Sequence, residues 1–232
     1  MDKLNIARNQ LLAPTGLTDE DMNKVLSLVL GGAVNAADLY FQASTRESWS
    51  LDDGIVKDAS FNIEQGVGVR AIAGEKCGFA YSDDIILPAL LESSKAARSI
   101  AKAGQTNQLK SWHVSSGHSL YASANPLEAL SESQKMDLLK EADAAARAED
   151  PRVKQVMVSL LGSHETILVA RSDGTLGADV RPLVRFNISV IVEQNGRREQ
   201  GTMGGGGRYD YHQFIESNAA NEFAREAVRQ AI

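Results

Sequence analysis

Ser-Phe-Asn-Ile-Glu-Gln-Gly-Val-Gly-Val-Arg-Ala-Ile-Ala-Gly-Glu-Lys-Cys-Gly-Phe-Ala-Tyr, residues 60–81, is the stretch that decides the fold. Its middle alternates, so that one face of an extended chain carries Val67, Val69 and Ala71 and the other carries Gly68, Arg70 and Ile72. Residues 73–75, Ala-Gly-Glu, predict a reversal, because glycine accepts the positive φ that hairpin turns need. Residues 76–81 then form the returning strand of a β-hairpin.

The pattern on either side of this hairpin predicts amphipathic helices and short strands. Thr18 and Asp21 form a capping box before the apolar stripe of a helix over 22–30, and Ser131 with Gln134 forms a second one before a helix that ends at 150. Further helices are expected over 85–103 and 220–231. Strands are expected over 38–44, 46–51, 55–61, 153–161, 166–171, 175–180, 186–192 and 198–202, with turns between them that include 162–164.

Short links between successive strands favour hairpins, so the predicted fold class is α+β: mostly antiparallel sheet, with helices packed on one side. We expect residues 1–232 to be one domain. The Asp-Gly turns at Gly54 and Gly174 are 120 residues apart, which suggests half-repeats over 18–104 and 131–232 related by a pseudo-two-fold axis. The alternative is equally open, since any α+β chain with short hairpins looks self-similar at this level.

Composition narrows the function classes. The net charge of −6 disfavours a general nucleic-acid binder, because such proteins carry basic surfaces. The single cysteine, Cys77, cannot form an internal disulfide, and a reducing compartment fits best. The densest apolar run, residues 25–34, is too short to span a bilayer, and the amino terminus lacks the apolar core of a secretory signal. We therefore expect a soluble, cytoplasmic protein without a membrane partner.

The residues themselves predict no catalytic and no metal site. His164-Glu165 could begin a zinc-protease motif, but Leu168 stands where the second histidine is needed and the segment is typical of a strand. Cys77 has no neighbouring histidine in sequence, so a buried core cysteine is the expected role. Arg70 is expected to make a buried ion pair with a strand carboxylate.

A run of four glycines followed by arginine is the most unusual composition in the chain. We predict a substrate-binding role, with extended peptide or a partner as first choice, for Gly204, Gly205, Gly206, Gly207 and Arg208. Four glycines are costly to order, so a flexible linker is the second reading. A phosphate-cradling loop is the third, because no Lys-Ser/Thr follows the glycines.

Several blocks of sequence follow one another in an order that is typical of one family. They read Asp38-Leu-Tyr-Phe-Gln, Glu47-Ser-Trp, Gln65-Gly-Val-Gly-Val-Arg-Ala-Ile-Ala-Gly-Glu-Lys, Gly78-Phe-Ala-Tyr, Asp173-Gly-Thr-Leu, Asp179-Val-Arg-Pro-Leu-Val-Arg and Gly204-Gly-Gly-Gly-Arg. Together they resemble the amino-terminal domain of the TldD/PmbA metalloprotease family, from about Leu11 to the end of the chain.

The resemblance implies a cytoplasmic zinc metallopeptidase that pairs with a TldE (PmbA) subunit and degrades or trims unfolded peptides. It implies roles in microcin maturation and antitoxin turnover, and an older label as a modulator of DNA gyrase. The metal site of the family is a His-Glu-x-x-x-His helix plus a cysteine in the carboxy-terminal half, where the glutamate acts as general base on zinc-bound water.

This chain departs from the family pattern at that motif. After His164-Glu165, Val169 occupies the position of the second histidine, and Cys77 lies outside the region in which the family carries its metal-binding cysteine. We therefore expect a non-catalytic amino-terminal domain, inactive alone and without zinc, that helps to form the peptide chamber and a dimer with a TldE-like subunit or with itself. The alternatives are a stand-alone peptide- or protein-binding module and a gyrase-associated regulatory protein.

Overall fold

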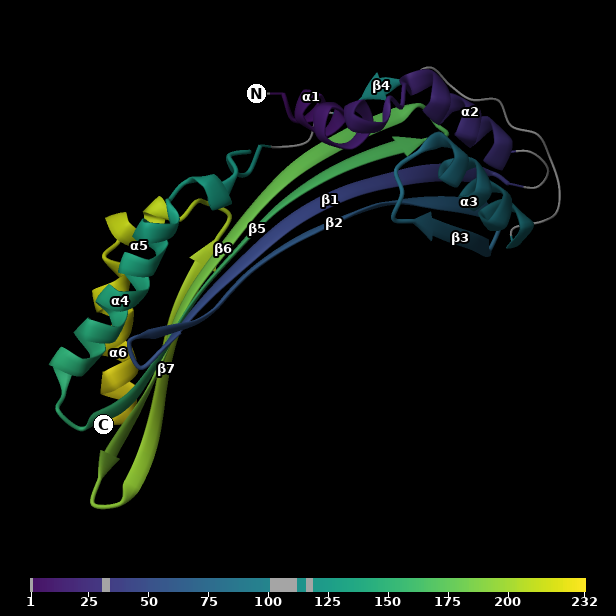
Figure 1. Ribbon diagram of the computed structural model, residues 1–232. Coiled ribbons are helices and arrows are strands. Elements are labelled where there is room, and N and C mark those ends of the chain that lie inside the picture. Colours follow the sequence, from purple (N-terminus) through teal and green to yellow (C-terminus); the bar gives the residue numbers. More distant parts are fainter. Residues whose placement is uncertain (1, 31–33, 101–111, 116–118) are drawn as a thin grey trace. The chain divides into compact units, whose positions relative to one another are not determined.

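A computed structural model describes residues 2–30, 34–100, 112–115 and 119–232 (Figure 1). The chain forms two compact units, and neither is continuous in sequence. Unit 1 comprises residues 1–44, 63–120 and 165–180, and unit 2 comprises residues 45–62, 121–164 and 181–232. The half-repeats expected over 18–104 and 131–232 stay a prediction.

The strands form a seven-stranded sheet. Their bounds are β1 Ala36–Asp52, β2 Ile55–Ala73, β3 Lys76–Ser82, β4 His113–Val114, β5 Val153–Arg171, β6 Thr175–Gln194 and β7 Arg197–Gly207. The order is β3-β2-β1-β5-β6-β4, and β7 also pairs with β6. The β2–β3 and β6–β7 pairs are antiparallel, whereas the short β4 is parallel to β6. The predicted class, α+β with a mostly antiparallel sheet, is confirmed.

Unit 1 packs helices against one face of its strand segments. They are α1 Lys3–Ala7, α2 Asp19–Val29 and α3 Leu87–Ile100, with a π turn at Arg8–Leu12 and a 3-10 turn at Ala13–Thr15 between the first two. Thr18 caps α2 as predicted: its hydroxyl accepts the Asp21 N–H, and the Asp21 carboxylate accepts the Thr18 N–H. The buried side chains of α2 pack with Val67, Val69 and Ala71 in one core.

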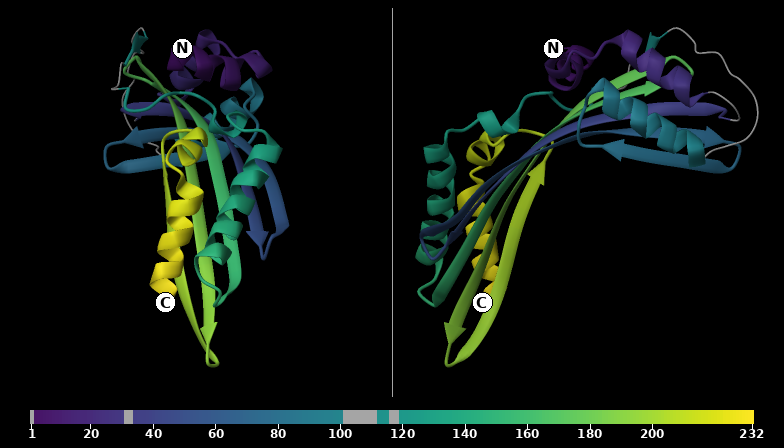
Figure 2. Two further views of the ribbon diagram at one scale, coloured as in Figure 1. Left: turned by 90° about the vertical axis from the view of Figure 1, so that its left-hand side faces the viewer. Right: turned by 45° about the vertical axis from the view of Figure 1, so that its right-hand side comes forward.

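Unit 2 has its own core beneath α4 Glu132–Glu149, α5 His212–Glu216 and α6 Ala219–Ala231, and a 3-10 turn at Pro126–Glu128 precedes α4. Figure 2 shows α4 and α6 side by side along the strands of this unit. The ring of Phe186 on β6 lies 5.5 Å from that of Phe214 and 6.0 Å from that of Phe223, which fastens α5 and α6 to the sheet.

The predicted hairpin of residues 60–81 forms, and its register runs from Val67 opposite Ser82 to Ala73 opposite Lys76. The prediction for Cys77 is wrong, because its partner across the ladder is Ile72 on the face without helices, and Cys77 is exposed there. Arg70 does pair with a strand carboxylate, Asp38, at 2.7 Å, but its side chain is half exposed rather than buried.

The strands are longer than predicted. Residues 38–44 and 46–51 lie in one strand, β1, and residues 153–161 and 166–171 lie in another, β5. The turn predicted at 162–164 is therefore wrong. Gly162 serves a different purpose in β5: a Cβ there would overlap the Tyr211 hydroxyl, so glycine admits this ring against the strand. The polar, serine-rich composition of residues 105–125 predicts a long connection, and part of this segment lies outside the described residues.

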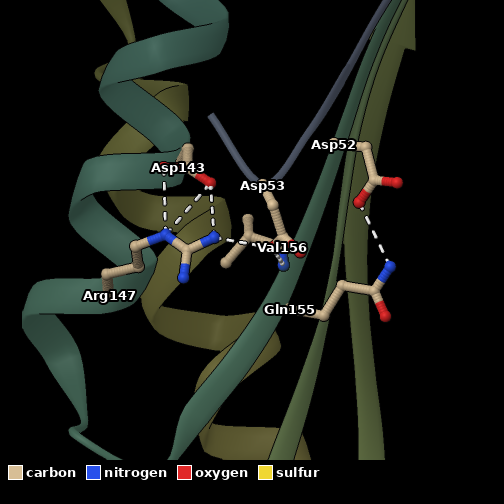
Figure 3. A network of polar contacts seen from close by, with 6 residues as sticks. All are labelled: Asp52, Asp53, Asp143, Arg147, Gln155 and Val156. Atoms are coloured by element: carbon tan, nitrogen blue, oxygen red, sulfur yellow. Dashed lines mark hydrogen bonds and ion pairs between the residues drawn. The ribbon is translucent and has the colours of Figure 1, made fainter. Parts of the chain in front are cut away.

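The Asp-Gly turn between β1 and β2 is tied to the neighbouring strand and helix (Figure 3). Asp53 and Gly54 both have positive φ, and Asp53 exchanges two 3.0 Å hydrogen bonds with the Val156 backbone, one of them through its carboxylate. Arg147 on α4 donates to the Asp53 carboxylate at 2.6 Å and also pairs with Asp143. The Val156 N–H, and then Arg147, hold the pKa of Asp53 below its usual value.

Candidate functional site

The glycine run forms the end of β7 and is neither a linker nor a loop. Gly204, Gly205, Gly206 and Gly207 lie opposite Asn187, Phe186, Arg185 and Val184 of β6 in an unbroken antiparallel register. All four glycines therefore pair with β6 on one side of the strand.

Each glycine is required by a close approach within this chain. A Cβ at Gly204 would overlap the Asn187 side chain, and one at Gly206 would overlap the Val184 carbonyl oxygen. A Cβ at Gly205 would lie 2.9 Å from the Phe223 ring, so even alanine needs that ring to move. The entropy that these glycines cost is offset by close packing of β7 against β6 and α6.

The outer side of β7 is an edge, because β6 is its only strand partner among the described residues. Asn195 and Gly196 both have positive φ, which defines a type I′ turn and makes Gln194 and Arg197 a hydrogen-bonded pair. Hydrogen-bonded and open pairs alternate along an antiparallel ladder. Thr202, Gly204 and Gly206 therefore direct their N–H and C=O groups away from β6, toward the open edge.

Arg208 follows the edge but is held by its own chain. Its Nη1 donates to the Pro182 carbonyl oxygen at 3.2 Å, and its guanidinium lies 5.2 Å from the centre of the Tyr121 ring. The side chain is exposed but oriented, so its first role is to fix the end of β7.

A buried charged cluster, which the sequence reasoning missed, supports the segment after the glycines. Lys135 on α4 pairs with Glu47 on β1 at 2.7 Å and donates to the Leu127 carbonyl oxygen at 2.8 Å. The two side chains are only 4% and 7% exposed, so both charges are withdrawn from water. The Lys135 ammonium also lies 5.4 Å from the Tyr211 ring centre and 5.9 Å from that of Trp49. The sequence feature that could have revealed this cluster is the helical spacing of Lys135 from the apolar residues Leu138, Leu139 and Ala142.

Tyr211 is the member of this cluster nearest the glycine run in sequence. Burial, and then the negative charge of Glu47 nearby, raise the pKa of its phenol. Tyr211 therefore stays neutral and anchors the chain between β7 and α5, which makes the cluster a scaffold for the edge strand.

The donor sets that the structure describes do not fit a catalytic metal. Within residues 2–30, 34–100, 112–115 and 119–232, no three His, Cys, Asp or Glu side chains gather closely enough to hold an ion. His164 lies in β5, where burial lowers its pKa. Across the same residues, no helix has the length and apolar character needed to cross a membrane.

Solved structures share this fold. The chain superposes on TldE from Thermococcus kodakarensis with a TM-score of 0.69 at 15% identity, covering 91% of this chain and 47% of that one. It superposes on a Thermotoga maritima protein that carries the name of a modulator of DNA gyrase with a TM-score of 0.72 at 16% identity, covering 92% and 47%.

Sequence comparisons define the family. Residues 37–101 match domain 1, and residues 125–232 match the central domain, of the PmbA/TldA metallopeptidases. A metalloprotease TldD homolog of Haemophilus influenzae is 46% identical over 99% of this chain and 49% of its own length. One of Buchnera aphidicola (Acyrthosiphon pisum) is 40% identical over 98% and 48%. The chain belongs to the PmbA/TldD metallopeptidase family and spans about half the length of these curated relatives.

Proposed function

We propose that this chain is the non-catalytic amino-terminal half of a TldD-like zinc metallopeptidase that degrades or trims unfolded peptides. The family match supports a metallopeptidase context, and the donor sets described above do not fit a metal. This amino-terminal half forms part of the wall of the peptide chamber and contacts a TldE-like subunit or a second copy of the chain. Zinc, the general base and the cleavage step belong to the other half of such a protein. The compartment is the cytoplasm.

Within this role, extended peptide pairs with the open edge of β7. The observation that carries the proposal is the phase of the ladder, which turns the N–H and C=O groups of Gly204 and Gly206 toward the open edge. An added strand gains its affinity from such main-chain hydrogen bonds and does not depend on sequence, which suits a peptidase for unfolded chains.

The test replaces Thr202, which is exposed and has its N–H on the open edge. Thr202→Pro removes that donor without removing a ladder bond to β6, and Thr202→Ala is the matched control because it keeps the donor and loses the same side chain. Affinity for a fluorescent unfolded peptide, measured by anisotropy, is expected to fall at least about fivefold for Thr202→Pro relative to Thr202→Ala. Equal affinities for the two variants would refute edge pairing.

The metal and partner assignments have separate tests. Elemental analysis of the purified chain is expected to find far less than one zinc per chain, and tightly bound zinc near one per chain would overturn the proposal. Sedimentation velocity with and without a TldE-like subunit is expected to show a heavier species with the partner present. A chain that stays monomeric in both samples would instead support a stand-alone binding module.

A further inference from the structure

A cationic hollow of about 390 Å³ lies on the face of the unit 2 sheet that has no helices. Its lining comes from strands β1, β2, β5 and β6: Arg46, Glu47, Ser48, Ser60, Asn62, Leu161, Gly162, Ser163, Leu183, Val184 and Arg185. Glu47 and Trp49 face the α4 side of β1, so the alternation of a strand places Arg46 and Ser48 on the opposite face.

The charge of the hollow is opposite to that of the whole chain. Arg46 and Arg185 are both exposed there, whereas the one carboxylate in the lining, Glu47, is already neutralised by Lys135. The chain carries a net charge of −6, whereas the exposed Arg185 guanidinium has no carboxylate partner among the residues that the structure describes. A low-dielectric hollow of one sign attracts ligands of the other sign.

The Arg185 side chain is held in one direction, but only one of its N–H donors is engaged within the described residues. In the part of the chain that the structure describes, its side chain makes one hydrogen bond, from Nε to Asn187 Oδ1 at 2.9 Å. Asn187 Nδ2 donates in turn to Ser159 Oγ at 3.4 Å, which fixes the direction of the arginine. Both Nη groups keep their four N–H donors, and their planar geometry matches a carboxylate bidentately.

The remaining lining adds neutral donors and an apolar floor. Ser48 and Ser60 lie 2.7 Å apart, so one hydroxyl hydrogen links them and the other can reach a ligand. Leu161 and Leu183 are 40% and 45% exposed on the same face, which leaves apolar area for a ligand to cover.

We infer that this hollow binds the free carboxylate of a peptide whose carboxy-terminal residue is apolar. Arg185 binds the carboxylate, and Leu161 and Leu183 contact the terminal side chain. The inference rests on the proposed peptide function and adds a binding group to it, because the β7 edge reads only backbone.

The experiment compares two peptides, acetyl-Ala-Ala-Leu with a free carboxylate and the same peptide with a carboxamide, on the intact chain by titration calorimetry. The acid is expected to bind at least about tenfold more tightly than the amide, and Arg185→Gln is expected to remove that preference. Arg229→Gln is the matched control, since it removes the same charge from an exposed position on α6. The preference is also expected to fall with added salt.

Each outcome decides between the two proposals. Equal binding of acid and amide, both weakened by Thr202→Pro, would overturn the carboxylate site and leave the edge intact. An acid preference that Arg185→Gln removes, with the affinities for both peptides unchanged by Thr202→Pro, would support the hollow and refute the edge. Displacement of the acid by inorganic phosphate at equal concentration would overturn a peptide site in favour of a general anion site. Failure of both peptides to bind would refute both proposals.

Discussion

Replacing Lys135 with methionine should be among the most destabilising single changes in unit 2. The substitution keeps the length of the side chain but leaves the Glu47 carboxylate buried without its 2.7 Å partner. It also leaves the Leu127 carbonyl oxygen without its 2.8 Å donor. Breaking one partner of a buried ion pair costs about 3–5 kcal/mol, and because both side chains are less than a tenth exposed, solvent can compensate little of this.

The assay is urea unfolding followed by circular dichroism, with the free energy of unfolding taken from the midpoint and slope. Lys140→Met is the matched control, because Lys140 lies on the same helix but is exposed, and its replacement should change stability by less than about 0.5 kcal/mol. A loss below about 1 kcal/mol for Lys135→Met would refute the reasoning, since the pair would then contribute no more than a surface ion pair.

A double variant separates the pair from simple loss of packing. Lys135→Met combined with Glu47→Leu removes both charges and leaves apolar side chains in the same space. Such replacements are often neutral, so the double variant should be more stable than Lys135→Met by about 2 kcal/mol or more. If instead the two losses add, the cluster acts through shape alone.

Three further changes test the packing, the electrostatics and the capping of the fold. Gly162→Ala should destabilise by about 1–3 kcal/mol because its Cβ would overlap the Tyr211 hydroxyl, whereas Gly177→Ala, whose Cβ meets nothing within 4 Å, should be nearly neutral in the same urea assay. The pKa of Asp150 is lowered to about 2 by its hydrogen bonds with Arg152, so its contribution is complete above about pH 4 and is lost as pH falls toward 2. In thermal unfolding experiments over that pH range, the Asp150→Asn variant should therefore lose less stability than the native chain. Parallel curves of stability against pH for the two proteins would contradict this. Thr18→Ala removes the α2 cap and should cost about 1 kcal/mol, measured by hydrogen exchange of the first turn, and unchanged protection would exclude a capping role.

The sequence predicted local features well because their causes are local. The turns at Gly54, Gly174 and Gly196 form where Asp-Gly and Asn-Gly stand, and all three glycines have positive φ. Both capping boxes, at Thr18 and at Ser131, form as expected. In each case the backbone is set by residues within three positions, so no tertiary information was needed.

The long strands and the site could not be predicted in the same way. Gly162 has the composition of a turn, and only the approach of Tyr211, 49 residues further on, explains a glycine within β5. The exposure of Cys77 depends on which face of the sheet the helices cover, which alternation alone does not decide. Lys135 could have been questioned from the sequence, because a lysine stands within an apolar stripe, but its partner Glu47 lies 88 positions away.

The two-residue turn at Asn195-Gly196 sets the alternation of hydrogen-bonded and open pairs along the whole of β7. Because open and bonded pairs alternate strictly, the turn decides, eight residues before Gly204, which peptide groups the molecule offers to a visiting chain. One residue inserted into that turn would exchange the roles of odd and even positions. The N–H and C=O groups of Gly204 and Gly206 would then point toward β6 and those of Gly205 and Gly207 toward the open edge, although the composition of the strand would be unchanged. The number of residues in the turn therefore determines which backbone groups the edge of β7 presents, as much as the types of residues in the strand do.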